Sequence, residues 1–250
     1  MKNRFWARLA GVPLWMETHW PYTAQLFEGY CIDPTAEDEA QYRALLGRQT
    51  PISVSEAEIE REQTAGDHFP ADYLESLAIY RKICTLLLPL DVVLFHCSAL
   101  EMDGRAYLFT APSGTGKSTH AALWRKVFGQ RVRMINDDKP LLRRETDGSW
   151  RVFGTPYGGK DNLQNNISQT IGGIVLLERG EENCITLVSA RDAFPRLLAQ
   201  TYHDTQAPEA LLRTMDLVGT LAQLPVFRLE CTISEQAVRV AYDALRGEAK

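Results

Sequence analysis

The sequence has no apolar stretch long enough to cross a membrane, since its longest apolar runs, at 86–88 and 92–95, span only a few residues. Segment 1–20 is positively charged but has neither a continuous apolar core nor a small-residue cleavage site, so we expect no signal peptide and no membrane association. Basic residues are not in excess: 27 Lys and Arg stand against 32 Asp and Glu, a formal net charge of −5. We therefore expect no nucleic-acid partner, because the basic field that grips a phosphate backbone is missing.

Paired cysteines are also missing. The five cysteines are scattered along the chain without a CxxC pair, at positions 31, 84, 97, 184 and 231. An odd, scattered set is typical of reduced thiols and argues against a disulfide framework or a zinc site. The cysteine pattern therefore indicates a cytoplasmic protein.

The composition itself is that of an ordinary globular protein, with 45% hydrophobic and 24% charged residues in a chain of 250. This length corresponds to one large domain, or to one domain with a small appendage. No repeat, low-complexity segment or clear linker interrupts the chain. The hydrophobic pattern becomes regular only from residue 70, so we expect an N-terminal α+β segment of unknown role, 1–69, packed on a core domain, 70–250.

Strands and helices alternate in the core region, which predicts an α/β fold with a mixed sheet and flanking helices. Before it, clustered aromatics predict short strands, and a polar stretch at 55–63 predicts a helix capped by Ser53 or Ser55. Asp103-Gly104 and Asp147-Gly148 are typical of hairpin turns. The predicted strands are 92–95, 106–110, 131–136, 141–144, 150–153, 174–177, 185–188 and 226–231, and the predicted helices are 73–87, 118–128, 190–202, 208–224 and a last one capped by Ser234.

A glycine-rich segment separates the strand at 106–110 from the helix that follows, and it reads Ala111-Pro112-Ser113-Gly114-Thr115-Gly116-Lys117-Ser118-Thr119. In this context glycines allow successive backbone N–H groups to surround phosphate oxygens, and the helix N-terminus adds its positive dipole. Lys117 would reach the β- and γ-phosphates, and Ser118 would bind Mg²⁺. Ala111 replaces the usual first glycine and requires a negative φ. The alternative is a surface turn with an unrelated lysine, but the strand–loop–helix context favours a nucleotide-binding loop.

Two adjacent carboxylates, Asp137 and Asp138, follow the strand at 131–136. In phosphate-loop proteins an acidic residue at the end of a neighbouring strand can hold Mg²⁺ or orient the nucleophile. Adjacent residues at a strand end point to opposite sides, so one carboxylate can lie near the metal while the other accepts a proton from an attacking hydroxyl. The alternative is a solvated Asp-Asp turn. The nearby glycine loop favours the functional interpretation.

Four further features are weaker candidates. Segment 154–160 either closes over the substrate, with Lys160 neutralising transferred phosphate, or forms a flexible connection. His120 and Trp124 could approach a nucleotide base, but we expect them to be packing residues. For Lys139 we expect a local ion pair with the aspartates. Glu178 is a spare carboxylate that could bind a metal.

The chain resembles the HPr kinase/phosphorylase family in several motifs. They are His96-Cys97-Ser98-Ala99, DGRAYLF, SGTGKST and INDD, the last ending in Asp138. That family is structurally related to phosphoenolpyruvate carboxykinase, whose loop also reads SGTGK. A group of short bacterial HPr-kinase-like proteins is similar over most of residues 70–246, where Tyr80-Arg81-Lys82, NDDKP, GTPYGGK, LERGEEN and ISEQAV match.

The resemblance implies a nucleotide-binding domain of the HPr kinase/phosphoenolpyruvate carboxykinase type that uses ATP and Mg²⁺. It implies that Ser113, Gly114, Thr115, Gly116, Lys117, Ser118 and Thr119 bind the nucleotide, and that Ser118 and Asp137 bind the metal. It further implies that Asp138 accepts the proton of the attacking hydroxyl, that Asp137 supports it, and that His96 lies near the transferred phosphoryl group. The chain departs from the family in two features, a glutamate metal ligand after the aspartates and a PGRN-like segment, neither of which has a match.

These residues together predict a kinase for a hydroxyl group, and the resemblance implies that the acceptor is a serine or threonine on a small protein or peptide. Two alternatives stay open: a kinase for a hydroxyl of a small metabolite, and a nucleotide-binding regulator without catalysis. A carboxykinase is disfavoured, because the chain is much shorter than that family. HPr-kinase enzymes are often oligomeric, so a homo-oligomer is also an expectation.

Overall fold

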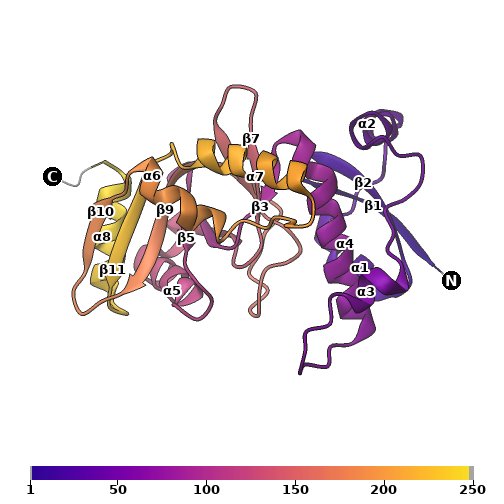
Figure 1. Ribbon diagram of the computed structural model, residues 1–250. Coiled ribbons are helices and arrows are strands. Elements are labelled where there is room, and N and C mark those ends of the chain that lie inside the picture. The colour runs from indigo at the N-terminus through magenta and orange to yellow at the C-terminus, as the bar shows by residue number, and fades with distance from the viewer. Residues whose placement is uncertain (1, 248–250) are drawn as a thin grey trace. The chain divides into compact units, whose positions relative to one another are not determined.

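The computed structural model describes residues 2–247, and the chain divides into two compact units, Met1–Val92 and Val93–Lys250 (Figure 1). The boundary expected from the sequence lay earlier, at residue 69. The two differ because helix α4 (Ala71–Leu87) packs against α1 (Pro21–Leu26) and α3 (Glu56–Glu60), which belong to the first unit.

The first unit contains an antiparallel hairpin, β1 (Asn3–Leu9) and β2 (Val12–Thr18). Trp6 and Trp15 face each other in its register and stack with ring centroids 5.8 Å apart. Tyr42 of α2 (Ala36–Leu46) packs edge-on against both rings. These three N-terminal aromatic residues therefore serve as packing residues in this unit.

The helices of the first unit begin and end at identifiable residues. Helices α2 and α3 begin with capping boxes formed by Thr35 and Ser55, respectively. The helix in the polar stretch at 55–63, with Ser55 as one of its two candidate caps, had been predicted from the sequence. A short 3-10 helix, Glu28–Tyr30, follows α1. The apolar period of α4 stops at Leu87, and Pro89 lies in a 3-10 turn, Leu88–Leu90, which confirms the predicted helix and its end.

The second unit contains a mixed, mostly antiparallel sheet with the strand order β3-β7-β8-β9-β5-β4-β6, and β11 and β10 add beside β9. The strands are β3 (Val92–Leu94), β4 (Ser98–Met102), β5 (Arg105–Thr110), β6 (Val132–Asn136), β7 (Leu141–Arg144), β8 (Trp150–Phe153), β9 (Ser168–Arg179), β10 (Cys184–Leu187) and β11 (Val226–Cys231). Because β5 and β11 run parallel to β9, the carboxyl ends of these three strands lie at the same edge of the sheet.

The hairpin turn predicted at Asp103-Gly104 is present, and both residues have positive φ, 52° and 76°. The partner strand differs from the expectation. Strand β5 pairs with β4 (Ser98–Met102), which the sequence analysis missed, rather than with the run at 92–95. Residues 98–102 include Ala, Leu, Glu and Met, which are typical of helices. Strand β4 nevertheless forms because it lies between β5 and β6 and pairs with both, which overrides this local preference.

Helices flank this sheet, which confirms the predicted mixed α/β architecture. They are α5 (Lys117–Phe128), α6 (Ala190–Leu198), α7 (Pro208–Leu221) and α8 (Glu235–Leu245), with a 3-10 turn at Gly129–Arg131 (Figure 1). Side chains of α5 and α8 form one core with β4, β5, β6, β9 and β11, in which Trp124 is fully buried. The Ser234 hydroxyl caps α8 as predicted, whereas α6 ends earlier than expected, before the bridge between Phe95 and Thr201.

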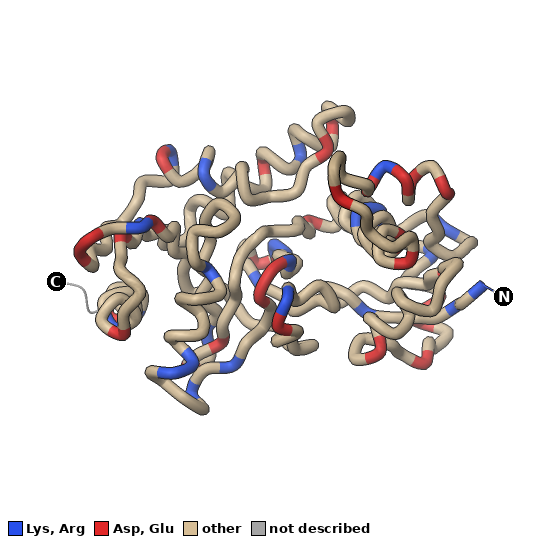
Figure 2. Tube along the Cα trace, turned by 90° about the horizontal axis from the view of Figure 1, so that it is seen from below, with Lys and Arg blue, Asp and Glu red and all other residues tan. Residues whose placement is uncertain are grey.

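Within residues 2–247, none of the helices combines the length and the apolar character that a membrane span requires. Figure 2 shows Lys and Arg interspersed with Asp and Glu along the trace.

Candidate functional site

The glycine-rich loop connects the carboxyl end of β5 to the first residue of α5, Lys117. Gly114 and Gly116 have φ of 77° and 122°, a region in which a side chain would be strained. Ala111, in contrast, is buried and keeps a φ outside the positive range, as its replacement of a glycine requires. The local sequence therefore produces a strand–loop–helix unit whose conformation depends on its two glycines.

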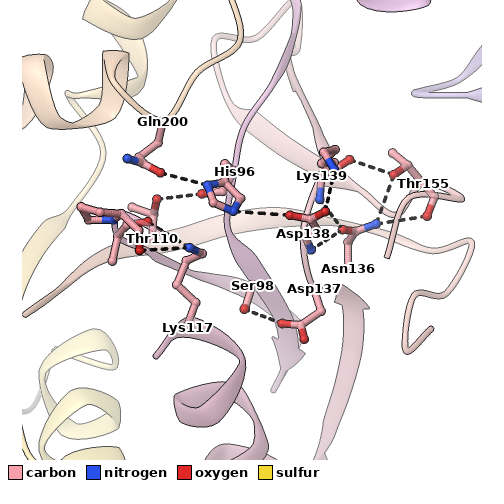
Figure 3. Close-up of polar contacts among 12 residues, drawn as sticks. His96, Ser98, Thr110, Lys117, Asn136, Asp137, Asp138, Lys139, Thr155 and Gln200 are labelled. Carbon is pink, nitrogen blue, oxygen red and sulfur yellow. Dashed lines mark hydrogen bonds and ion pairs between the residues drawn. The ribbon is translucent and has the colours of Figure 1, made fainter. Parts of the chain in front are cut away.

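Lys117 is 8% exposed and folds back along this loop. Its Nζ donates to the backbone carbonyl of Ala111 at 2.9 Å and to that of Pro112 at 3.5 Å (Figure 3). Burial lowers the pKa of Lys117, and the charges of Asp138 and Asp137 oppose that effect. The loop thus holds a buried amine near two carboxylates.

Asp137 directly follows β6 and is buried, with 8% exposure. The hydroxyl of Ser98, on β4, donates to its Oδ1 at 2.5 Å (Figure 3). Burial raises the pKa of Asp137, while hydrogen bonds from Ser98 and Ser118 lower it by less. The structure therefore brings together Asp137 and Ser118, the two residues that the sequence analysis expected at a metal ion.

Asp138 has different partners. Its Oδ1 lies 3.4 Å from Nε2 of His96, and its Oδ2 accepts from Nζ of Lys139 at 2.7 Å (Figure 3). Burial alone would raise the pKa of Asp138, but the contacts with His96 and Lys139 outweigh it, so this pKa lies below the ordinary value. The local ion pair expected for Lys139 is confirmed, and the two adjacent carboxylates do differ in their surroundings.

His96 follows β3 and is held by Gln200, which follows α6. The backbone carbonyl of Gln200 accepts from the backbone N–H of His96 at 2.8 Å, and Gln200 Oε1 lies 3.1 Å from Nδ1 of the imidazole. With Nδ1 donating to Gln200, Nε2 is the ring nitrogen that faces Asp138. His96 can therefore exchange a proton with this carboxylate.

Asn136 and Thr155 join the aspartates to segment 154–160. The amide nitrogen of Asn136 donates to the carbonyl and the hydroxyl of Thr155, both at 3.1 Å, and its Oδ1 accepts from the backbone N–H groups of Asp138 and Lys139 at 2.9 Å. A Cβ on Gly159, where φ is 78°, would lie 3.4 Å from that of Asp138. Segment 154–160 thus packs beside the aspartates.

Four residues of the site, Ser98, Asn136, Thr155 and Gln200, were not predicted from the sequence. Ser98, Asn136 and Thr155 lie in the motifs HCSA, NDDKP and GTPYGGK, so the motifs contained a signal for three of the four. Gln200 lies in none of them. It comes next to His96 only through the fold, because α6 returns the chain to the end of β3.

His120 and Trp124 are packing residues, as expected. Nε1 of Trp124 donates to Nε2 of His120 at 2.9 Å, the two side chains are 0% and 4% exposed, and both pack on Phe109. Glu178, considered as a metal ligand, instead forms an ion pair with Arg196 of α6. Among residues 2–247, no three His, Cys, Asp or Glu side chains cluster in a way that could hold a metal ion, so a cation here would depend on Ser118, Asp137 and phosphate oxygens.

Two hollows open beside the glycine loop. The first, of about 370 Å³, lies between the loop and α6 and is lined by Ala111, Pro112, Arg196, Ala199 and Gln200 among others; we call it the α6 hollow. The second, of about 360 Å³, is lined by the loop, by Thr119, His120 and Leu123 of α5, and by Thr232 and Ile233; we call it the α5 hollow. Thr115, Leu177, Glu178 and Arg179 line both, so the loop and the end of β9 separate the two.

The chain matches no protein-family model and no curated protein. Among solved structures it is similar to the HPr(Ser) kinase/phosphatase from Coxiella burnetii, with 13% sequence identity and a TM-score of 0.35. That match covers 62% of this chain and 93% of the other.

Proposed function

We propose that this protein is an ATP- and Mg²⁺-dependent kinase that phosphorylates a serine or threonine hydroxyl on a small protein or peptide. One observation carries the proposal: Lys117 and Ser118, at the end of a glycine loop, lie beside two carboxylates that have different partners. The mixed sheet with this strand–loop–helix unit also supports a domain of the HPr kinase/phosphoenolpyruvate carboxykinase type.

In this proposal, different residues of the site carry out different parts of phosphoryl transfer. Bound Mg·ATP supplies the phosphoryl group and a cation that neutralises the charge on it. The loop N–H groups and Lys117 bind phosphate oxygens, and Ser118 and Asp137 hold the cation. Asp138 orients the acceptor hydroxyl and accepts its proton, which His96 can take in turn. The pKa of Asp138 lies below its ordinary value, so the carboxylate is ionised at neutral pH.

A small metabolite is the second candidate acceptor. The α6 hollow, which Gln200 lines, has a volume of about 370 Å³, which is within the range of small-molecule sites. Separation of the labelled products by molecular size distinguishes a small-metabolite acceptor from a peptide or protein.

The test is transfer from γ-labelled ATP and Mg²⁺ into a size-fractionated extract of the source cell, together with the dissociation constant of a fluorescent ATP analogue. We expect Lys117→Ala to weaken nucleotide binding at least tenfold and to abolish transfer. Asp138→Asn is expected to abolish transfer but to leave binding unchanged, because Asp138 acts on the acceptor. Lys126→Ala is the matched control, since Lys126 lies on the same helix, is exposed and pairs with Glu235.

Three outcomes separate the alternatives. Transfer by the wild type but by neither site variant supports the kinase. Transfer retained in both variants contradicts it. Nucleotide binding that depends on Lys117, without transfer into any fraction, indicates a regulator without catalysis.

A further inference from the structure

The two hollows lie on either side of the glycine loop and the end of β9, which separate them. A loop of this kind surrounds the α- and β-phosphates, and its lysine reaches the β- and γ-phosphates. Nζ of Lys117 lies at the carbonyls of Ala111 and Pro112, and both of these residues line the α6 hollow. The terminal phosphate therefore belongs on the α6 side of the loop.

The nucleoside belongs on the other side. The α5 hollow is lined by Thr119, His120 and Leu123, which lie farther along α5 than Lys117. A nucleotide whose terminal phosphate is at Lys117 extends in this direction past the first turn of the helix. This leaves the α6 hollow open beside the phosphate to be transferred.

The α6 hollow also adjoins the residues proposed to act on the acceptor. Gln200 lines it, and the same side chain contacts the imidazole of His96, which in turn faces Asp138. The side chains of Gln200 and His96 therefore connect the α6 hollow to the proposed base, Asp138. An acceptor that entered from the α5 side would meet the nucleoside instead.

Charge indicates what the α6 hollow can bind. Two arginines, Arg179 and Arg196, and one carboxylate, Glu178, line it, and the remaining lining residues are uncharged. Arg179 donates to loop carbonyls, whereas Arg196 pairs with Glu178 and has the more exposed side chain of that pair, 45% against 30%. The planar guanidinium of Arg196 can bind a second carboxylate through two N–H groups.

We propose that the α6 hollow is the acceptor site and that it binds a hydroxyl compound bearing a carboxylate, which Arg196 contacts. This proposal rests on the proposed kinase function. The carboxylate can belong to an acidic side chain of a peptide or to a free hydroxy acid, because both present the same group to Arg196. The phosphoryl group passes from ATP to the acceptor oxygen, the bond to ADP breaks, and the hydroxyl proton goes to Asp138.

The test uses three variants and one extract. Arg196→Gln removes the guanidinium, and Ala199→Trp fills the hollow at an exposed position that directly follows α6. Arg191→Gln is the matched control, because it makes the same charge change on an exposed residue of α6 that does not line the hollow. The source-cell extract is separated on an anion-exchange resin into retained and unretained pools and then by size, and each pool is phosphorylated with γ-labelled ATP.

We expect acceptor activity in the retained pool. Arg196→Gln and Ala199→Trp should lower transfer at subsaturating acceptor at least tenfold, while the dissociation constant of a fluorescent ATP analogue stays within about twofold of the wild type. Arg191→Gln should behave as the wild type. The size of the labelled product then separates a peptide from a free hydroxy acid.

Other results overturn the inference. If Ala199→Trp transfers phosphate at the wild-type rate, the acceptor does not enter the α6 hollow. If the acceptor activity is found in the unretained pool, or if Arg196→Gln leaves transfer unchanged, no carboxylate is bound there. In each of these results the wild type still transfers phosphate, so the proposed kinase function stands. If the wild type binds nucleotide but labels no pool, the kinase function fails, and the acceptor site fails with it.

Discussion

Gln200 holds His96 at two points, one on the backbone and one on the side chain. Its backbone carbonyl accepts from the His96 N–H at 2.8 Å, and its Oε1 lies 3.1 Å from Nδ1 of the imidazole. The backbone contact places the residue, while the side-chain contact orients the ring so that Nε2 faces Asp138. A change that removes only the second contact therefore separates ring orientation from local folding.

Gln200→Leu makes this change, because leucine has a similar size but no acceptor for Nδ1. We expect a kcat about tenfold lower, since a misoriented His96 no longer serves Asp138, and an unchanged KM for ATP. Gln206→Leu, on the exposed loop after α6, is the control and should have no effect. A fall in thermal stability together with an unchanged kcat would contradict the positioning role.

Asn136 connects Asp138 to segment 154–160, and both polar atoms of its fully buried side chain have partners. Asn136→Ala leaves the backbone N–H of Asp138 without this acceptor, whereas the N–H of Lys139 keeps the carbonyl of Tyr157. Since an unsatisfied donor costs about 1–3 kcal/mol, we expect urea denaturation to show a loss of about 2 kcal/mol in the free energy of unfolding. Thr155→Ser keeps the hydroxyl that accepts from Asn136 and donates to the carbonyl of Lys139, and it loses only one methyl group, so it should cost about 1 kcal/mol. Equal losses for the two variants would rule out the central position assigned to Asn136.

The parts of the site that consist of consecutive residues could be predicted from the sequence. The strand–loop–helix unit around Lys117 is one example, and the paired aspartates at the end of β6 are another, because local chemistry determines both. The hairpin turn at Asp103-Gly104 was predictable for the same reason, since its positive φ values suit these residues.

The remaining parts depend on contacts between distant segments. Gln200 is 104 residues from His96, and Ser98 is 39 residues from Asp137, so no local pattern connects either pair. Strand β4 was missed because its residues do not favour a strand, and it forms between two partners, β5 and β6. The Glu178–Arg196 pair likewise requires α6 to lie beside the end of β9.

Arg179, at the end of β9, binds the outer side of the glycine loop. Its Nη2 donates to the carbonyl of Gly114 at 2.7 Å and its Nε to that of Thr115 at 3.4 Å. Holding these carbonyls helps to keep the loop in one conformation before phosphate arrives. We expect Arg179→Gln to weaken binding of a fluorescent ATP analogue about fivefold to tenfold, because the loop must then be ordered on binding.

Arg228→Gln is the matched control for Arg179, because Arg228 is on the neighbouring strand β11 and pairs with Glu230 rather than with the loop. Its effect on nucleotide binding should be less than twofold, and both variants should unfold at the wild-type temperature. Equal weakening by the two variants would mean that general charge, rather than the contact with the loop, determines affinity.

Burial of His120 makes the stability of the protein depend on pH. Burial lowers the pKa of this imidazole to about 4 from its ordinary 6.5, and Nε2 accepts from Trp124 at 2.9 Å, which requires an unprotonated nitrogen. Between these two pH values the unfolded chain binds a proton that the folded chain does not. The stabilisation is therefore complete above about pH 6.5 and is lost as the pH falls toward about 4.

We expect the free energy of unfolding, measured in urea, to fall by about 2 kcal/mol between about pH 7.5 and about pH 5 through this residue. His120→Gln keeps an acceptor for the Trp124 N–H but cannot be protonated. The free energy of unfolding of this variant should therefore fall by about 2 kcal/mol less than that of the wild type over the same pH range. His203→Gln, which changes a partly exposed histidine after α6, should retain the wild-type slope. If His120→Gln shows the same slope as the wild type, the acid sensitivity must come from groups other than the imidazole, and the packing of α5 against β5 does not depend on its protonation.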